Sequence, residues 1–167
     1  MSKTLVVVCS LGKNVELAEQ LMTVLNELGE KNKMINLVDI PLPLYSTKEE
    51  STAIPSEAKQ LAEEFASAGR FIIVAPEYNG SMPPVLNNAV AWISRGGGDN
   101  WRSAFNGKYA VVATHSGGGG LHVLKAIRGQ FEYLGCTVLA RGIQTNFQKS
   151  LNPESAKTIL TQLINLH

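Results

Sequence analysis

The residues best suited to forming a ligand site are concentrated in the nine positions from Pro76 to Pro84, which read P-E-Y-N-G-S-M-P-P. Tyr78 offers a flat apolar face with a polar tip, and Gly80 permits close approach of a ligand to the backbone. The prolines stiffen the segment and leave some carbonyl groups without local partners. This segment therefore suits a planar ring with polar edges. In the alternative interpretation, Asn79 and Gly80 form an ordinary turn.

A second candidate segment, residues 10–14, reads S-L-G-K-N and joins an apolar run to a helical pattern. A helix N-terminus presents unpaired backbone N–H groups and a partial positive charge, so it can hold an anion. Ser10 and Asn14 could add side-chain donors, and Lys13 adds a full charge. In the alternative interpretation, Asn14 is only the N-cap of the helix and Gly12 only a turn residue.

A third segment, residues 116–120, consists of a serine and four consecutive glycines. Backbone amides of such a segment can approach the edge of a ring at little steric cost. The alternative is a flexible connector before a helix that begins near Leu121. The glycines do not form the pattern G-x-G-x-x-G, so the sequence does not support a Rossmann-type dinucleotide site. His115, just before them, could donate a proton, although a lone histidine is more often a structural hydrogen-bonding residue.

Each of these segments follows an apolar run of strand length, and amphipathic helical patterns separate the runs. The predicted strands are Leu5 to Cys9, Met34 to Val38, Phe71 to Ala75, Tyr109 to Thr114 and Thr137 to Ala140. The helical stripes are centred on Leu21, Leu61, Ala89, Ile127 and Leu160. Five β-α units in one chain imply a doubly wound α/β sheet, in which ligands bind beyond the carboxyl ends of the strands.

Length, composition and charge limit the other possibilities. A chain of 167 residues with 44% hydrophobic residues predicts one folded domain. Lys and Arg number 15 against 14 Asp and Glu, without a basic run, which argues against a nucleic-acid binder. The longest apolar stretch, Leu5 to Cys9, is too short for a membrane span, and no secretory signal precedes it, so a cytoplasmic protein is expected. Cys9 and Cys136 lack a C-x-x-C partner, which predicts buried reduced thiols and no metal site.

The segment that begins at Pro76 carries a specific resemblance. Its run Pro76-Glu77-Tyr78-Asn79-Gly80-Ser81 is followed by Pro83, Leu86, Asn88-Ala89-Val90 and Trp92-Ile93-Ser94-Arg95. This series closely resembles the signature of the NADPH-dependent FMN reductase family, and a looser resemblance extends over the whole chain. Relatives usually read like Gly-Ser-x-Arg-x-x-Ser after the first strand, and this chain lacks both the Arg and the second Ser there.

The resemblance implies a flavodoxin-like fold: a three-layer α/β/α sandwich with a five-stranded parallel sheet of order 2-1-3-4-5. Residues 1–167 would form a single FMN-binding domain. The resemblance also implies FMN held without a covalent bond, NADPH or NADH as transient reductant, and a flavin, quinone or similar small molecule as electron acceptor. Family members are usually dimers or tetramers, so we expect a homodimer or homotetramer.

The resulting prediction is an FMN-dependent NAD(P)H oxidoreductase. The cofactor phosphate is expected at the helix that follows the first strand, and the ring edge is expected against backbone groups of the two later segments. Hydride transfer needs no acid, base or nucleophile from the protein, so no catalytic residue is predicted. The candidate cofactor-binding residues are Ser10, Lys13, Asn14, Pro76, Glu77, Tyr78, Asn79, Gly80, Ser116, Gly117, Gly118 and Gly119.

Two other functions fit parts of the sequence. One is a flavodoxin-like FMN electron carrier, but such carriers are typically strongly acidic and this chain has a formal charge of +1. The other is a non-catalytic flavodoxin-like dimer that has lost its flavin site. This function stays possible because residues 10–14, after the first strand, form a shorter segment than in relatives and lack their Arg and second Ser. The glycine-rich excursion from Arg95 to Lys108 is interpreted as a subunit-contact or pocket-rim loop, with a loop folded back over its own domain as the alternative.

Overall fold

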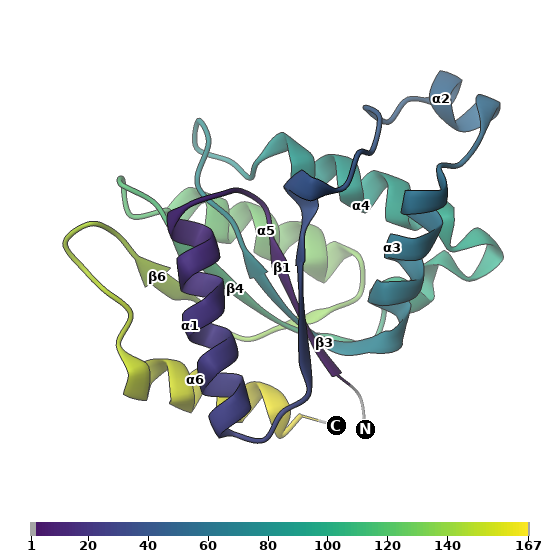
Figure 1. Cartoon of the computed structure of the whole chain (residues 1–167). Helices are drawn as coiled ribbons and strands as arrows, with labels where there is room; N and C mark the ends of the chain where they lie inside the picture. Colours follow the sequence, from purple (N-terminus) through teal and green to yellow (C-terminus); the bar gives the residue numbers. More distant parts are fainter. Residues whose placement is uncertain (1–2, 167) are drawn as a thin grey trace.

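Six strands form the central sheet of the computed structural model, which describes residues 3–166 (Figure 1). The strands are β1 (Lys3–Val8), β2 (Asn32–Asn36), β3 (Ala68–Val74), β4 (Tyr109–His115), β5 (Thr137–Val138) and β6 (Ile143–Thr145). All pair in parallel, in the order β2-β1-β3-β4-β5, with β6 also paired to β4. The predicted order 2-1-3-4-5 is confirmed.

Helices cover both faces of this sheet. They are α1 (Lys13–Glu27), α2 (Thr47–Thr52), α3 (Ser56–Ser67), α4 (Pro84–Gly96), α5 (Leu121–Tyr133) and α6 (Pro153–Ile164). Helices α1 and α6 lie on one face, and α3, α4 and α5 lie on the other (Figure 1). Among residues 3–166, no helix combines the length and the apolar composition that crossing a bilayer requires.

The central strands are apolar on both sides because both sides are covered. Side chains alternate between the faces of a strand, so Leu5 and Val7 join the core beneath α3, α4 and α5, whereas Val6 and Val8 join the core beneath α1 and α6. All four are fully buried. This explains why the runs that predict these strands are continuous in apolar residues rather than alternating with polar ones.

The fifth position in the sheet is shared by two short strands, where the sequence predicted one strand from Thr137 to Ala140. β5 pairs with the beginning of β4 and β6 with its end, and residues 139–142 between them are not strand. Arg128 of α5 donates hydrogen bonds to the carbonyl oxygens of residues 138–140 at 2.5–3.3 Å. A Cβ at Gly142 would lie 3.0 Å from a backbone oxygen of β4. The expected five-stranded sheet is therefore corrected to six strands, because Arg128 binds carbonyls at the break.

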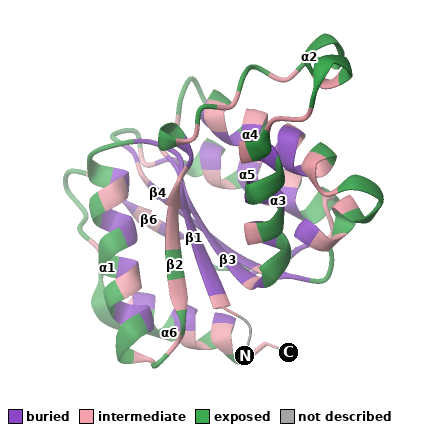
Figure 2. Ribbon diagram, turned by 45° about the vertical axis from the view of Figure 1, so that its right-hand side comes forward, coloured by how far each residue is buried: buried purple, intermediate pink, exposed green. Residues whose placement is uncertain are grey.

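The connection between β2 and α3 is more elaborate than predicted. Strand β2 ends at Asn36, and a 3-10 turn, η1 (Leu37–Asp39), follows it, where the sequence predicted strand to Val38. The chain then runs outward to α2, which has no buried residue (Figure 2). Tyr45 secures the excursion to α4, because its backbone N–H donates to the Asn88 side chain at 2.7 Å and its ring packs edge-on against Trp92.

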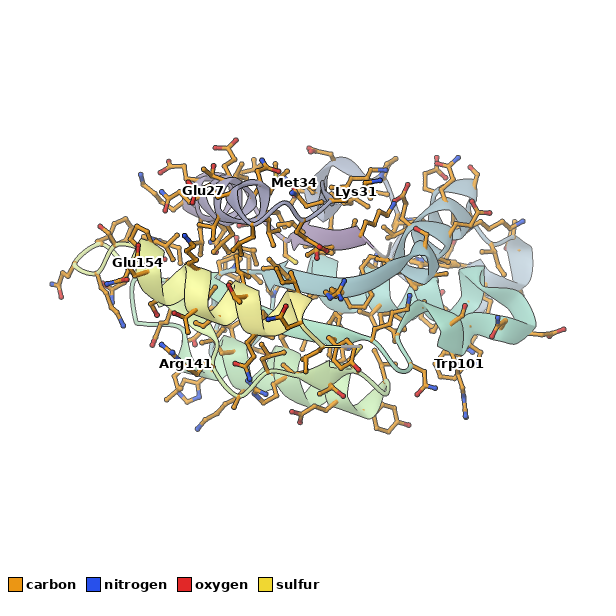
Figure 3. The ribbon with its side chains drawn as sticks, turned by 90° about the horizontal axis from the view of Figure 1, so that it is seen from below. Glu27, Lys31, Met34, Trp101, Arg141 and Glu154 are labelled. Carbon is orange, nitrogen blue, oxygen red and sulfur yellow. The ribbon has the colours of Figure 1, made fainter. Side chains whose placement is uncertain are left out.

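The segment from Arg95 to Lys108 is folded back over its own domain. It contains a second 3-10 element, η2 (Gly98–Ala104), and it places Phe105 in the core with no exposed surface, 5.6 Å from the ring of Phe65. Trp101 lies at the edge of the molecule (Figure 3). No residue of this fully described segment lines the cleft at the strand ends, so the pocket-rim interpretation is wrong; the subunit contact stays a prediction.

Two buried cationic side chains donate hydrogen bonds to carbonyl groups at the ends of helices. Lys108 Nζ donates to the carbonyl oxygens of residues 65, 66 and 68, at the end of α3, and burial lowers the pKa of its ammonium group. Arg70 donates to the carbonyl oxygens of residues 163, 164 and 166, at the end of α6. The last carbonyls of a helix have no partner within the helix, so these long-range donors satisfy groups that would otherwise be buried unpaired.

Candidate functional site

A cleft of about 630 Å³ opens at the carboxyl ends of β1, β3 and β4. It is lined by Cys9, Ser10, Leu11, Lys13, Asn14, Val38, Pro76, Glu77, Tyr78, Pro83, Pro84, Val85, His115, Ser116, Gly117, Gly118 and Phe147. The three segments predicted to meet at this edge of the sheet do meet there. Nine of the twelve candidate cofactor-binding residues line the cleft, and Asn79, Gly80 and Gly119 do not.

One end of the cleft has the properties of an anion site. Helix α1 begins at Lys13, and Gly12 precedes it with a φ of 62°, a left-handed conformation that favours glycine. No described residue accepts a hydrogen bond from the backbone N–H groups of residues 11–14. Ser10 is buried, and its hydroxyl has only a long contact of 3.4 Å, to the Leu11 carbonyl oxygen. Four free amides, a nearly free hydroxyl and the positive end of the helix dipole thus lie together at this end of the cleft.

Asn14 has a different role from the N-cap considered above. It lies inside the first turn of α1, and its side-chain amide exchanges two hydrogen bonds with the backbone of His115, at 2.9 and 3.0 Å. Asn14 is 4% exposed. The side chain therefore connects the anion end of the cleft to the end of β4, and its backbone N–H remains available to a ligand.

The second segment is held in a tight hairpin. Tyr78 and Ser81 exchange backbone hydrogen bonds at 3.0 Å in both directions, and Asn79 and Gly80 between them have positive φ angles of 51° and 73°. Positive φ at both central positions is the geometry of a type I′ turn, for which Asn-Gly is favoured. The turn interpretation of this dipeptide is confirmed. The turn presents the Tyr78 side chain, half exposed, at the mouth of the cleft.

Glu77 joins the second segment to the third. Its carboxylate oxygen Oε2 accepts hydrogen bonds from the backbone N–H groups of His122 and Val123, at 2.9 and 3.1 Å, in the first turn of α5. Its own backbone N–H donates to Ser116 Oγ at 2.8 Å. A carboxylate at a helix N-terminus satisfies unpaired donors and interacts favourably with the helix dipole. Glu77 thereby fixes the distance between the two loops that form the far end of the cleft.

The third segment leaves open space beside the backbone. A Cβ at Gly118 would meet nothing within 4 Å, and one at Gly117 would meet only the Phe147 ring, at 3.6 Å. The N–H groups of these two glycines have no acceptor in the part of the chain that the structure describes. By contrast, the N–H groups of Glu77 and Tyr78 already have acceptors within the protein. The free backbone donors at this end of the cleft therefore come from the glycine segment.

Several lining residues were not among the sequence candidates. Phe147 is 78% exposed and lies on a turn after β6, in which the Asn146 side chain accepts hydrogen bonds from the N–H groups of Gln148 and Lys149. Val38 reaches the cleft from η1, and Pro83, Pro84 and Val85 reach it from the start of α4. An aromatic residue within the polar run N-F-Q-K is a sequence signal for an exposed ring, but it does not indicate which cleft the ring faces.

The two cysteines are free and buried, as predicted. Burial raises the pKa of the Cys9 thiol well above its ordinary value, and it raises that of Cys136 to about 12. Cys9 lines the cleft, but a thiol held in its protonated form is neither a nucleophile nor a metal ligand. Across residues 3–166, no group of three or more His, Cys, Asp or Glu side chains is placed to hold a metal ion.

Comparison with known proteins shows which family the sequence matches. The sequence profile of the NADPH-dependent FMN reductase family matches residues 2–148. A 2-hydroxy-1,4-benzoquinone reductase from Burkholderia sp is 38% identical over 135 residues, which cover 79% of this chain and 71% of that protein. A quinone reductase from Pseudomonas putida is 34% identical over 113 residues, which cover 66% of this chain and 59% of that protein. A quinone reductase from Escherichia coli K12 is 36% identical over 101 residues, 57% of this chain and 53% of that one.

Solved structures support the same fold. The FerB flavoenzyme, an NAD(P)H:(acceptor) oxidoreductase from Paracoccus denitrificans, superposes with a TM-score of 0.79 at 19% identity and covers 99% of this chain and 96% of that one. A flavodoxin from the domain Archaea superposes with a TM-score of 0.66 at 13% identity and covers 96% of this chain and 95% of that one. The fold is therefore flavodoxin-like. Because the family profile spans most of the chain, the protein belongs to the NADPH-dependent FMN reductase family.

Proposed function

We propose that the protein binds FMN in the cleft and works as an NAD(P)H oxidoreductase with a quinone or similar small molecule as electron acceptor. One observation carries the proposal. The same cleft has four unpaired backbone N–H groups at the start of α1 and, at its opposite end, the unpaired N–H groups of Gly117 and Gly118. The relatives named quinone reductases support the choice of acceptor, and the chain spans little more than half of the length of two of them.

The residues present fit FMN. The amides of residues 11–14, the Ser10 hydroxyl and Lys13 would hold the phosphate, which is the strongest acceptor on the molecule. Gly117 and Gly118 offer free N–H groups without side chains that would fill the space, and Tyr78 offers a ring at the mouth. A cleft of about 630 Å³ is within the usual range of cofactor sites. Contacts of FMN with all twelve candidate residues stay predictions, including those with Asn79, Gly80 and Gly119, which do not line the cleft.

The chemistry itself belongs to the cofactor: when bound, FMN accepts a hydride from a nicotinamide nucleotide and later delivers two electrons to the acceptor. The protein's contribution is position and electrostatics. The unpaired glycine amides would stabilise negative charge that develops on the ring edge, since preorganised donors need no reorganisation at the moment of reaction. Glu77 and Ser116 keep these amides in place. The chain thus performs the reaction without a catalytic acid or base.

The proposal is tested by visible spectroscopy of the purified protein. FMN is added, the free cofactor is removed, and NADPH and NADH are then added separately without oxygen. Rapid bleaching of the bound flavin by either nucleotide, followed by recovery of colour on addition of 1,4-benzoquinone, is the expected result. Bound flavin that resists both nucleotides would show an electron carrier instead, and a protein that retains no flavin would show that the site has been lost.

The phosphate assignment predicts a selective effect of Lys13→Ala. Lys13 is exposed and paired with Glu16 at 2.7 Å, so its interaction with a phosphate is screened by water. We expect the Kd for FMN to rise about threefold at low salt and the Kd for riboflavin, which has no phosphate, to stay the same. Quenching of flavin fluorescence measures both constants. Equal changes for the two ligands would show that Lys13 does not act on the phosphate.

Assembly and location extend the proposal. The family resemblance supports a homodimer or homotetramer, and light scattering on a sizing column measures the mass that distinguishes them. A cytoplasmic location is supported by the two free cysteines, because disulfides are rare in that compartment. Fractionation of cells that produce the protein, followed by immunoblotting, tests the location directly.

A further inference from the structure

His115 lines the cleft at the end of β4. It is the last residue of β4, and its backbone is bonded to the Asn14 side chain beside the anion end. The next residues, Ser116 and Gly117, already belong to the glycine segment at the far end. His115 also lines a second cavity of about 230 Å³, which adjoins the first on the side of α1 and the turn that carries Phe147. The backbone of His115 therefore joins the place suited to an anion to the place suited to a ring, and the residue lines both cavities.

Hydrogen bonding fixes the tautomer of the His115 ring. The hydroxyl of Thr145 donates to the carbonyl oxygen of Thr114 at 3.1 Å, because a carbonyl can only accept. The same hydroxyl lies 3.1 Å from His115 Nδ1, so it accepts a hydrogen bond from Nδ1–H. In the neutral imidazole, the proton is then on Nδ1, and Nε2 carries a free lone pair. The protein thus prepares Nε2 as a hydrogen-bond acceptor.

That acceptor has no partner. His115 Nε2 is buried, and no described residue donates a hydrogen bond to it. Buried polar atoms in folded proteins nearly always have a partner, because an unpaired one loses its hydration without compensation. The ring of Phe147 packs nearly at right angles to the His115 ring, with centroids 5.1 Å apart. Phe147 is 78% exposed on a surface turn, so little packing opposes a shift of its ring.

The position of His115 identifies the donor. The phosphate of FMN and the ring carbonyls are acceptors, whereas the ribityl chain between phosphate and ring carries hydroxyl groups, which donate. We propose that Nε2 of His115 accepts a hydrogen bond from a ribityl hydroxyl of bound FMN and thereby selects flavins that carry this chain. The inference rests on the proposed function, since it requires FMN in the cleft, and it makes His115 a specificity-determining residue that sequence reasoning had treated as structural.

Two variants distinguish the role of Nδ1 from that of Nε2. The amide of Asn reaches the position of Nδ1 but not that of Nε2, whereas the longer Gln side chain reaches the position of Nε2. We expect His115→Asn to raise the Kd for FMN about tenfold, the effect of one lost hydrogen bond, and His115→Gln to keep it within about threefold of the wild type. Lumiflavin, which has the ring but no ribityl chain, should bind all three proteins equally. Flavin fluorescence quenching measures each constant, and thermal unfolding checks that the variants are folded.

The outcomes are distinguishable from those of the proposed function. If the wild type binds no FMN, the function itself is rejected; if it binds FMN and His115→Asn binds it equally well, only the role of His115 is rejected. An equal loss of lumiflavin would show general damage to the cleft and would also overturn the assignment. In the wild type, nitrogen NMR of the imidazole, assigned by the signal absent from His115→Asn, should show Nδ1–H and a bare Nε2. The Nε2 signal should shift with FMN and not with lumiflavin; an Nε2–H tautomer would contradict the proposal.

Discussion

Replacing Glu77 by Ala is expected to weaken FMN binding about a hundredfold and to lower the free energy of unfolding by about 2 kcal/mol. The variant removes the carboxylate that accepts two backbone N–H groups of α5, at 2.9 and 3.1 Å, so those groups become unpaired. It also removes the side-chain link between the second segment and the start of α5, so that only the backbone hydrogen bond of residue 77 to Ser116 still joins the two loops. Loops displaced by about an ångström lose most of the benefit of preorganised donors.

The matched control for this prediction is Glu77→Gln. The Gln side chain has the same length and keeps one carbonyl oxygen as an acceptor for the same two N–H groups, but it loses the charge that interacts with the helix dipole. We expect it to lose about 1 kcal/mol of stability and less than tenfold in FMN affinity. Urea unfolding and fluorescence titration give both quantities. If Glu77→Ala bound FMN as tightly as Glu77→Gln, the carboxylate would not be positioning the loops.

Gly96→Ala is expected to lower the free energy of unfolding by about 2–3 kcal/mol, although it adds a single methyl group. Gly96 is the last residue of α4 and lies against α3. A Cβ there would lie 2.6 Å from the carbonyl oxygen of Ala58 and 3.2 Å from the Cβ of Ala62. Backbone cannot yield as a flexible side chain does, so the two helices must separate and open voids elsewhere in the core.

The same substitution in another helix should have the opposite effect. Gly129 lies within α5, and a Cβ there would meet nothing within 4 Å. Gly129→Ala should therefore raise the free energy of unfolding by about 0.5–1 kcal/mol, since alanine loses less backbone entropy in a helix. Denaturant unfolding of both variants provides the comparison. Loss of stability in both, or in neither, would refute the close contact between α3 and α4.

The place of the cleft could be predicted because it depends on local patterns. Continuous apolar runs indicated buried parallel strands, and the ends of such strands meet at one edge of a sheet. The turn at Asn79 and Gly80 follows from residue type alone, because few other dipeptides accept two positive φ angles. The unpaired backbone N–H groups at the start of α1 likewise follow from a helix that begins at residue 13, directly behind a strand.

What could not be predicted depends on pairs of residues far apart in the chain. The side-chain amide of Asn14 is hydrogen-bonded to the backbone of His115, 101 positions away. Asn14 therefore connects α1 to the end of β4 and is not the N-cap that its place in the sequence suggests. Arg70 reaches the end of α6, more than 90 positions away. The tautomer of His115 depends on Thr145, and its position against Phe147 depends on a turn that no periodicity defines. Contacts of this kind exist only after the chain has folded.

The break in the fifth strand has a consequence for self-association. An edge strand with a long row of unpaired N–H and C=O groups is a template on which a second sheet can assemble and from which cross-β aggregates can grow. In this protein that margin consists of strands of two and three residues, and the Arg128 guanidinium binds carbonyls at the break. A foreign strand could not dock there over an uninterrupted length. Association of subunits should therefore not extend the sheet at this margin.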